Sequence, residues 1–301
     1  MQAQDGAYLL ALLSAILFSG ASVIFARFAV SHSSLWMNLM KNIMAGVAFF
    51  LAAAVSLLFT EETLAGLGGT SVVCFALSGL VGLAIGDYFL FRGYQLIGSA
   101  RTIMIFSFSP IFLTIEGFLF FDQGLSMNQA VALLLMMACA WTISFEKFRT
   151  EGAWEWKGIL FALAGVLLDN VGVVLSKMAF DRSPNTSAFT ANAIRSVGSI
   201  IPLLAAQYYF GERAFFRFGR LEWKDRSLVV FASFFGTFLS LSCWLSALKI
   251  GHIGSLAGVG SFNPVAASLW EWVLLRKRPT PYLLVAMALF LAGFTVLLQG
   301  K

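Results

Sequence analysis

Long runs of apolar residues follow one another along the whole chain, and short polar stretches separate them. Nothing is charged between Asp5 and Arg27, between Asp122 and Glu146, or between Arg226 and Lys249. A helix crosses the hydrocarbon layer of a bilayer with about 20 such residues. The pattern therefore predicts ten membrane-spanning helices, at roughly 7–30, 35–60, 70–95, 100–121, 126–145, 156–180, 186–210, 227–249, 254–275 and 280–299.

Composition agrees with this interpretation. Hydrophobic residue types make up 59% of the chain and charged types only 12%, whereas a soluble domain usually holds about 25% charged residues. We therefore expect an all-α integral membrane protein and exclude an ordinary soluble enzyme or binding domain.

The distribution of basic residues bears on orientation. The chain has 20 Lys and Arg. By nearest connection, fifteen belong to the odd-numbered connections between spans and five to the even-numbered side with the termini. Cytoplasmic loops carry the excess of Lys and Arg, so the bias predicts cytoplasmic odd-numbered loops and both termini outside. Because these bases lie at helix ends rather than on one face, they do not indicate a nucleic-acid partner.

The sequence resembles itself at an offset of 154 residues. The segment Ser107–Pro110 then aligns with Ser261–Pro264, sharing the pattern Ser-Phe-x-Pro. Asn38 and Lys41 likewise align with Asn192 and Arg195. This repeat predicts two five-helix halves, 1–150 and 151–301.

Five is an odd number, so the second half must enter the membrane upside down relative to the first. Such inverted repeats are common among secondary transporters, where two similar halves rock around a site near the membrane midplane. We therefore expect an inverted 5+5 repeat that works by alternating access.

Prolines occupy equivalent points in the fourth and ninth predicted spans. Pro110 and Pro264 each remove a backbone donor and free a carbonyl one turn earlier. In lipid that carbonyl needs a protein or water partner, and neighbouring polar side chains are available: Ser107, Ser109, Ser261 and Asn263. We interpret this as a kinked helix beside a polar cavity; the alternative is a structural kink packed against its neighbours.

Several of these features together resemble the EamA-like transporters of the drug/metabolite transporter superfamily. Each half has a base early in its second span, Lys41 or Arg195, and the third span carries Gly86-Asp87 followed by the run 95–101, QLIGSAR. The fourth span contains proline. The resemblance covers essentially the whole chain, but the turns at 121–124 and 275–278 lack the glutamate usual in the family, so no role is transferred to them.

The resemblance implies a secondary transporter that moves small organic metabolites, such as amino acids or drugs, often as an exporter, without ATP and without a cofactor. We expect it in the plasma (inner) membrane of a bacterium or archaeon. Family members often have both termini in the cytoplasm, which conflicts with the charge bias and leaves the orientation open.

Acidic residues inside predicted spans are the first candidates for function, because a charge at membrane depth costs about 2.5–3.5 kcal/mol on insertion scales. Asp169 lies near the middle of the sixth span and is followed by Asn170. Its carboxylate is suited to binding a cationic group or carrying a proton; the alternative is a structural hydrogen-bonding role. Lys177, about two turns along the same helix, is expected to share its cavity.

Three further acids lie in predicted spans. Asp87 precedes Arg92 by five residues, so the two side chains are expected to form an ion pair that pins the third helix; the alternative is a gate or substrate contact. Glu116 and Glu271 follow the two prolines at similar distances. For both, a helix-end role or a salt bridge is favoured over a place in the substrate or proton pathway.

Basic residues form two pairs related by the repeat: Arg27 with Lys41, and Lys177 with Arg195. Facing inward, they would attract an anionic group such as a carboxylate or phosphate; otherwise they reach the lipid headgroups. Asparagines one turn before Lys41 and Arg195 favour a wet interior: Asn38 and Asn192.

These patterns predict a transporter with a small-molecule substrate, contacts to membrane lipids and protons as a candidate coupling ion. We expect no catalytic residue, metal, cofactor or nucleic acid; the oligomeric state stays open. One alternative is a flippase for lipid-linked sugars, which needs a lateral opening between helices. Another is a membrane-embedded enzyme acting on lipids, but the two histidines are far apart and no HExxH, GxSxG, CxxC or phosphate-loop motif occurs.

Overall fold

The computed structural model describes residues 3–59, 67–150, 155–276 and 280–299, except the side chains at 3, 99–100, 147–150, 271 and 274–275. Helices make up nearly all of these residues. The first half contains α1 (Ala3–Ser31), α2 (Ser34–Phe59), α3 (Gly69–Ser78), a π-helical segment (Gly79–Gly86), α4 (Asp87–Phe106), α5 (Ser109–Phe121) and α6 (Met127–Thr150).

The second half follows the same order. It contains α7 (Trp156–Arg182), α8 (Ala188–Tyr209), the short α9 (Ala214–Arg220), α10 (Trp223–Ser233), a π-helical segment (Phe234–Leu239), α11 (Ser240–Ile250), α12 (Ile253–Gly260), α13 (Asn263–Leu275) and α14 (Pro281–Gln299).

Nine helices in the described part of the chain are long and apolar enough to cross a membrane. They are Gln4–Ser31, Ser34–Phe59, Gly69–Gly98, Arg101–Phe121, Met127–Glu146, Trp156–Arg182, Ala188–Tyr209, Trp223–Ile250 and Pro281–Gln299. The predicted count of ten is therefore not confirmed. The predicted span 254–275 is not among the nine. A turn at Ser261 and Phe262 divides it into α12 and α13, and the span Arg101–Phe121 has the equivalent turn at Ser107 and Phe108. In both places a proline at the second residue restarts the helix.

Four features of the helices were not predicted: two π-helical segments, a change of direction within α4, and the extra helix α9. The centres of the third and eighth spans are π-helical. The chain changes direction inside α4 at Gly98, whose φ of 82° is readily reached only by glycine. The connection after α8 contains α9, where the sequence had predicted only a loop between spans.

Several corresponding elements begin at the 154-residue offset. The helices α2 and α8 begin at Ser34 and Ala188, α5 and α13 run over Ser109–Phe121 and Asn263–Leu275, and α6 and α14 begin at Met127 and Pro281. Even the unusual left-handed residues that end α5 and α13 are equivalent, Asp122 at φ 51° and Arg276 at φ 54°. The two halves therefore share local geometry as well as sequence.

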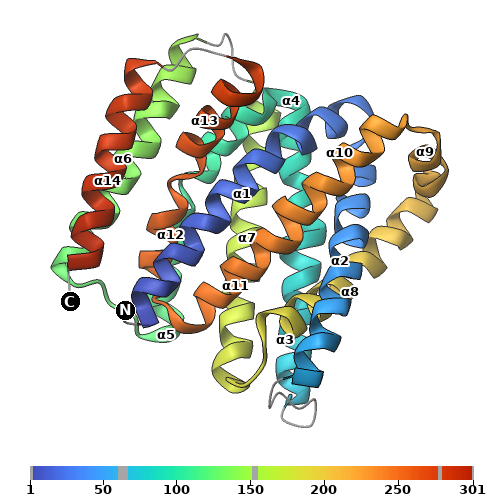
Figure 1. Cartoon of the computed structure of the whole chain (residues 1–301), viewed down its shortest axis with the longest axis horizontal. Coiled ribbons are helices and arrows are strands. Elements are labelled where there is room, and N and C mark those ends of the chain that lie inside the picture. The colour runs from blue at the N-terminus through green and yellow to red at the C-terminus, as the bar shows by residue number, and fades with distance from the viewer. Residues whose placement is uncertain (1–2, 60–66, 151–154, 277–279, 300–301) are drawn as a thin grey trace.

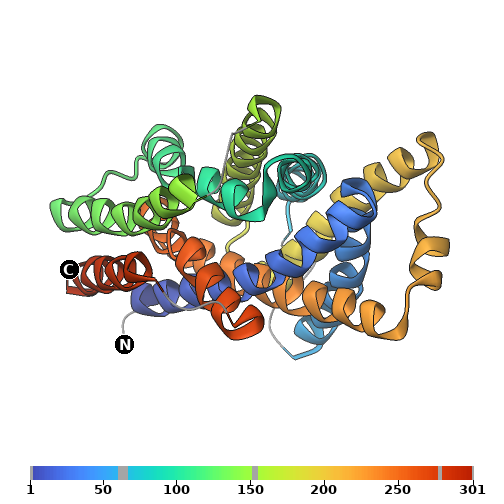
Figure 2. The same ribbon diagram turned by 90° about the horizontal axis from the view of Figure 1, so that it is seen from above.

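Helices from the two halves pack against each other in matching pairs. α1 lies along α11, while its counterpart α7 lies along α3 and α4; α2 pairs with α8, and α6 with α14 (Figure 1). Within each of the last two pairs the helices run in opposite directions. Seen from above, α6 and α14 lie at one side of the molecule and α9 at the other (Figure 2).

Close backbone contact fixes the position of α8. A Cβ added to Gly79 would lie 1.9 Å from the carbonyl oxygen of Arg195, so only glycine allows this approach. Small residues at helix interfaces serve this purpose in membranes, where apolar surface gains little by leaving lipid.

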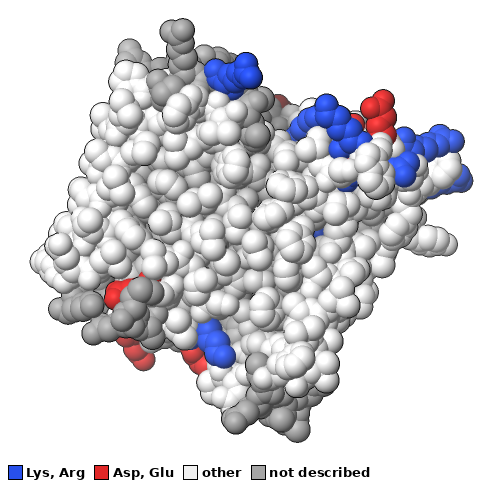
Figure 3. Space-filling view, viewed as in Figure 1, with Lys and Arg blue, Asp and Glu red and all other residues white. Residues whose placement is uncertain are grey.

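The outer surface is apolar between its two ends. Large hydrophobic side chains such as Leu51, Phe118 and Leu284 are more than half exposed. Charged side chains on the face shown in Figure 3 lie mainly at its upper and lower ends. This belt fits a lipid-facing surface.

Candidate functional site

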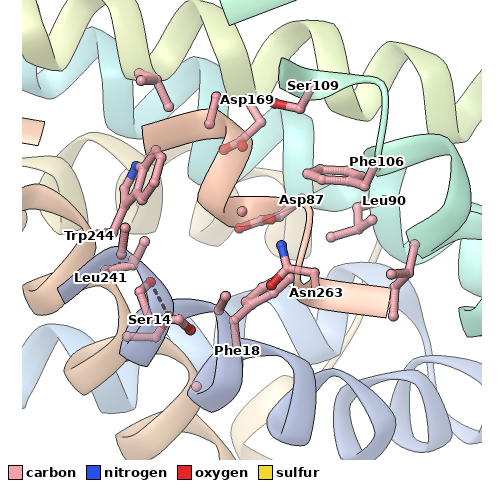
Figure 4. Close-up of a pocket in the computed structure, with 18 of the residues that line it drawn as sticks. Ser14, Phe18, Asp87, Leu90, Phe106, Ser109, Asp169, Leu241, Trp244 and Asn263 are labelled. Carbon is pink, nitrogen blue, oxygen red and sulfur yellow. Dashed lines mark hydrogen bonds between the residues drawn. The ribbon is translucent and has the colours of Figure 1, made fainter. Parts of the chain in front are cut away.

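A cavity lies in the middle of the helix bundle, between the halves. It has about 140 Å³ accessible to the centres of water-sized molecules, which is roughly ten times the minimum for one water. It therefore has room for several waters or a small solute. Figure 4 shows Asp87, Asp169 and Asn263 directed toward this space, with Trp244, Leu241, Phe106 and Phe18 around it.

The cavity is built largely from residues that are equivalent in the two halves. Eighteen of its 26 lining residues form nine pairs separated by 154 positions. These pairs are Ala15/Asp169, Lys41/Arg195, Leu83/Thr237, Asp87/Leu241, Leu90/Trp244, Ile103/Ala257, Phe106/Gly260, Ser107/Ser261 and Ser109/Asn263. The cavity thus lies where the two repeats meet.

The charges in the cavity follow this symmetry only in part. The bases Lys41 and Arg195 are equivalent, so each half contributes one cation from its second helix. The acids are not equivalent: Asp87 corresponds to Leu241 in the repeat, and Asp169 corresponds to Ala15. The two halves thus present different polar groups to the same space.

Lys41 and Asp87 form a nearly buried ion pair. The Lys41 Nζ lies 2.5 Å from Asp87 Oδ2, and the two side chains are 6% and 13% exposed. The prediction that Asp87 pairs with Arg92 is therefore wrong. Arg92 instead donates to Gln95, which donates to the carbonyl of Ala29. The π-helical segment before Asp87 and the approach of α2 determine the partner, and neither is visible in the spacing along α4.

Arg195 and Asp169 line the cavity without a direct partner of opposite charge. Arg195 is 2% exposed, and its guanidinium donates to Asn192 Oδ1 at 3.1 Å. Among the described side chains, no acid lies within 4.0 Å of Arg195 and no base within 4.0 Å of Asp169. The cavity therefore offers one cation and one anion that are not bound to each other.

Uncharged polar groups complete the site. Ser109 donates to Asn170 Oδ1 at 2.6 Å, which places Asn170 behind the cavity wall beside Asp169. Ser107 donates to the carbonyl of Ile103, one turn back. On the other side, Ser19 of α1 donates to the backbone and side-chain oxygens of Asn263, while the buried hydroxyl of Ser261 has no hydrogen-bond partner in the described structure.

A model of the EamA-like transporter family matches residues 6–145 and again 156–299. The chain belongs to this family. It is therefore a membrane transporter of the drug/metabolite transporter superfamily, which is not a family of enzymes.

Two other comparisons add little on function. A solved structure described only as "Crystal structure of protein" has a TM-score of 0.76 and 18% sequence identity to the transporter, and the match covers 97% of this chain and 96% of that one. It shows a shared fold alone. The comparison with curated proteins gave no match.

The asparagines predicted to indicate a wet interior do not line the cavity of the transporter. Asn38 donates to the carbonyl of Ala84 at 2.8 Å and Asn192 to that of Leu241 at 3.1 Å. These carbonyls lie in or just after the π-helical segments. The asparagines hold these irregular stretches against the second helix of each half.

Three further candidates, Lys177, Glu116 and Arg27, do not line the cavity. Lys177 is buried but pairs with Asp181 at 3.1 Å rather than sharing a space with Asp169. Glu116 lies in α5 with a buried carboxylate oxygen that lacks a described hydrogen-bond partner. Arg27 forms an exposed pair with Asp225. Glu271 lies in α13, and its side chain is outside the described part of the structure.

The prolines lie at the second residue of α5 and α13, where a missing backbone donor costs nothing. The preceding helices end at Phe106 and Gly260. The structure therefore has helix breaks at the cavity wall in place of the predicted kinks, and Pro110 itself lines the cavity.

Sequence reasoning missed a polar and aromatic part of the wall. Thr237, Ser240 and Trp244 of the eighth span line the cavity, and Ser14 of α1 exchanges hydrogen bonds with Ser240. The repeat held a signal only for their neighbour Leu241, which is equivalent to the predicted Asp87. The others carry no charge and resemble ordinary span residues.

Proposed function

We propose that this EamA-family protein is a secondary transporter that carries a small organic metabolite through the central cavity by alternating access. The observation that carries the proposal is the composition of the cavity, since nine repeat-related pairs line it. A site lined by equivalent residues from both halves can be approached from either side of the membrane when the halves rock.

The proposal includes an inverted arrangement of halves 1–150 and 151–301. Its support is the opposite direction of the equivalent helices α6 and α14 (Figure 1). Two copies related in this way exchange their inward and outward conformations during transport, so the same contacts can serve both states.

The charges of the cavity favour a substrate with polar ends. Arg195 is suited to a carboxylate or another anionic group, and Asp169 to an ammonium group or a proton. The apolar walls at Phe18, Phe106 and Trp244 would contact the organic part of the solute. We propose amino acids and cationic drugs as the first classes to test, with export across a bacterial or archaeal inner membrane as the direction.

The test has two stages. Purified protein is screened by thermal shift against amino acids, nucleotides and cationic drugs, because a ligand that binds the folded state raises the melting temperature. Compounds that raise it are then assayed for uptake into proteoliposomes, with empty liposomes as the blank. If no compound that binds is also transported, the proposal is wrong.

Two substitutions on α7 distinguish a role of the cavity in transport from a general effect of removing a carboxylate from this helix. Asp169→Asn is expected to leave the protein inserted and folded but to lower the transport rate at least tenfold. The matched control is Glu155→Gln at the N-cap of α7, since Glu155 is exposed and lies outside the cavity. Transport at the wild-type rate in Asp169→Asn would remove that residue from the mechanism.

A further inference from the structure

The connection between α8 and α10 forms an exposed surface that combines aromatic and basic side chains. Tyr208, Tyr209 and Trp223 are 91%, 82% and 81% exposed, and Phe215 of α9 is 62% exposed. Basic side chains cluster at the upper right of Figure 3, over α9 and the start of α10. We call residues 208–224 the α9 surface.

This surface is held in place by a set of hydrogen bonds and ion pairs. Glu212 accepts a hydrogen bond from Ser33, at the turn before α2, and pairs with Arg217. The indole of Trp36 donates to the carbonyl of Ala214 at 3.1 Å. Arg226 donates to the carbonyls of Gly219 and Leu221 at the end of α9. These contacts therefore hold the α9 surface in a defined conformation against the rest of the fold.

Several of its cations are not neutralised by the protein. Glu212 and Asp225 already pair with Arg217 and Arg27. Among the described side chains, no acid lies within 4.0 Å of the basic groups that remain: Arg213, Arg220 and Lys224. Glu222 is the one other acid in this stretch, and it too is exposed.

The aromatic groups show where the bilayer surface lies. Tyr208 and Tyr209 end the span α8, and Trp223 begins the span that contains α10. Tyr and Trp prefer the headgroup level of a membrane. The guanidinium of Arg220 lies 4.0 Å from the centre of the Phe216 ring, so a charged and an aromatic group contact each other on this surface.

We propose that the α9 surface binds the phosphate of an anionic phospholipid headgroup. Arg213, Arg220 and Lys224 would contact the headgroup, while Phe215 and Trp223 would lie against the upper acyl chains. Basic residues next to a membrane are attracted to anionic lipids, and the flanking aromatics favour a lipid over a soluble acidic protein. The proposal does not depend on which solute the transporter carries.

The experiment measures lipid binding to the full-length protein by native mass spectrometry in detergent. The probe is phosphatidylglycerol, titrated in parallel with phosphatidylcholine of the same chains. The test variant is Arg213→Gln with Lys224→Gln. The matched control is Lys157→Gln with Arg182→Gln, which removes the same charge from exposed positions outside the α9 surface.

For the test variant we expect the dissociation constant of phosphatidylglycerol to rise about 25-fold, from roughly fivefold for each cation removed. Binding of phosphatidylcholine and the affinity of the control are expected to stay unchanged. For the wild type, adding salt to about 0.5 M is expected to weaken phosphatidylglycerol binding, because exposed charges are screened; this arm needs no variant.

Three results would overturn the proposal. They are equal affinity for the two lipids, an equal loss of affinity in test and control variants, and a phosphatidylglycerol affinity that is unaffected by salt. Equal affinity for the two lipids would mean that the aromatic side chains contact any lipid. An equal loss in the test and control variants would indicate a general effect of net charge.

Discussion

Lys41 and Arg195 occupy equivalent positions in the two halves and line the same cavity, but only Lys41 has an acidic partner within 4.0 Å among the described residues. The partner, Asp87, is replaced by Leu241 at the equivalent place in the second half. Lys41 is therefore neutralised within the protein, whereas Arg195 is available to bind an anionic group of a solute. The repeat has thus diverged at the point where its halves meet.

The buried pair of Lys41 and Asp87 yields a prediction about stability. Lys41→Met would leave the Asp87 carboxylate almost buried without its partner, and breaking a buried pair costs about 3–5 kcal/mol. We expect a clear drop in the thermal unfolding midpoint of the purified protein.

The double variant Lys41→Met with Asp87→Leu serves as the control, because leucine is the residue that the second half uses at this place. It is expected to recover most of the lost stability. A single variant as stable as the wild type would mean that the pair does not stabilise the fold.

The contact between the third span and α8 yields a second prediction. Gly79→Ala would place a Cβ 1.9 Å from the carbonyl oxygen of Arg195, so α8 must shift away. We expect a loss of about 1–3 kcal/mol in stability, measured by thermal unfolding in detergent.

Gly68→Ala is the matched control for this substitution, since an added Cβ there meets no atom within 4 Å. If the two variants unfold at the same temperature, the close approach of the helices is not important for stability.

The third prediction concerns topology. In the proposed inverted repeat each half crosses the membrane five times, so the connection between the halves and the carboxy-terminal tail are expected on opposite sides of the membrane. Cysteine labelling from each side, or reporter fusions at position 152 and after the last residue, would measure this. A common side for both positions would exclude the inverted arrangement. The side of the tail would also decide between the charge bias, which predicts both termini outside, and the family habit, which places them in the cytoplasm.

The sequence alone was sufficient for the membrane class, the family and most of the spans. Length and apolarity are properties of each segment by itself, because the bilayer fixes how many apolar residues a helix needs. The repeat was also visible in the sequence, because Asn38, Lys41 and Pro110 have counterparts at one fixed offset.

Tertiary structure decided which side chains meet. Spacing within α4 suggested Arg92 as the partner of Asp87, yet α2 supplies Lys41. By contrast, Lys177 and Asp181 have the i,i+4 spacing of neighbours on one helix, so the sequence could have shown that pair. A partner on another helix depends on helix packing, on the π-helical centres and on the breaks before Pro110 and Pro264. These are set by contacts between distant segments, so no local pattern in the sequence specifies them.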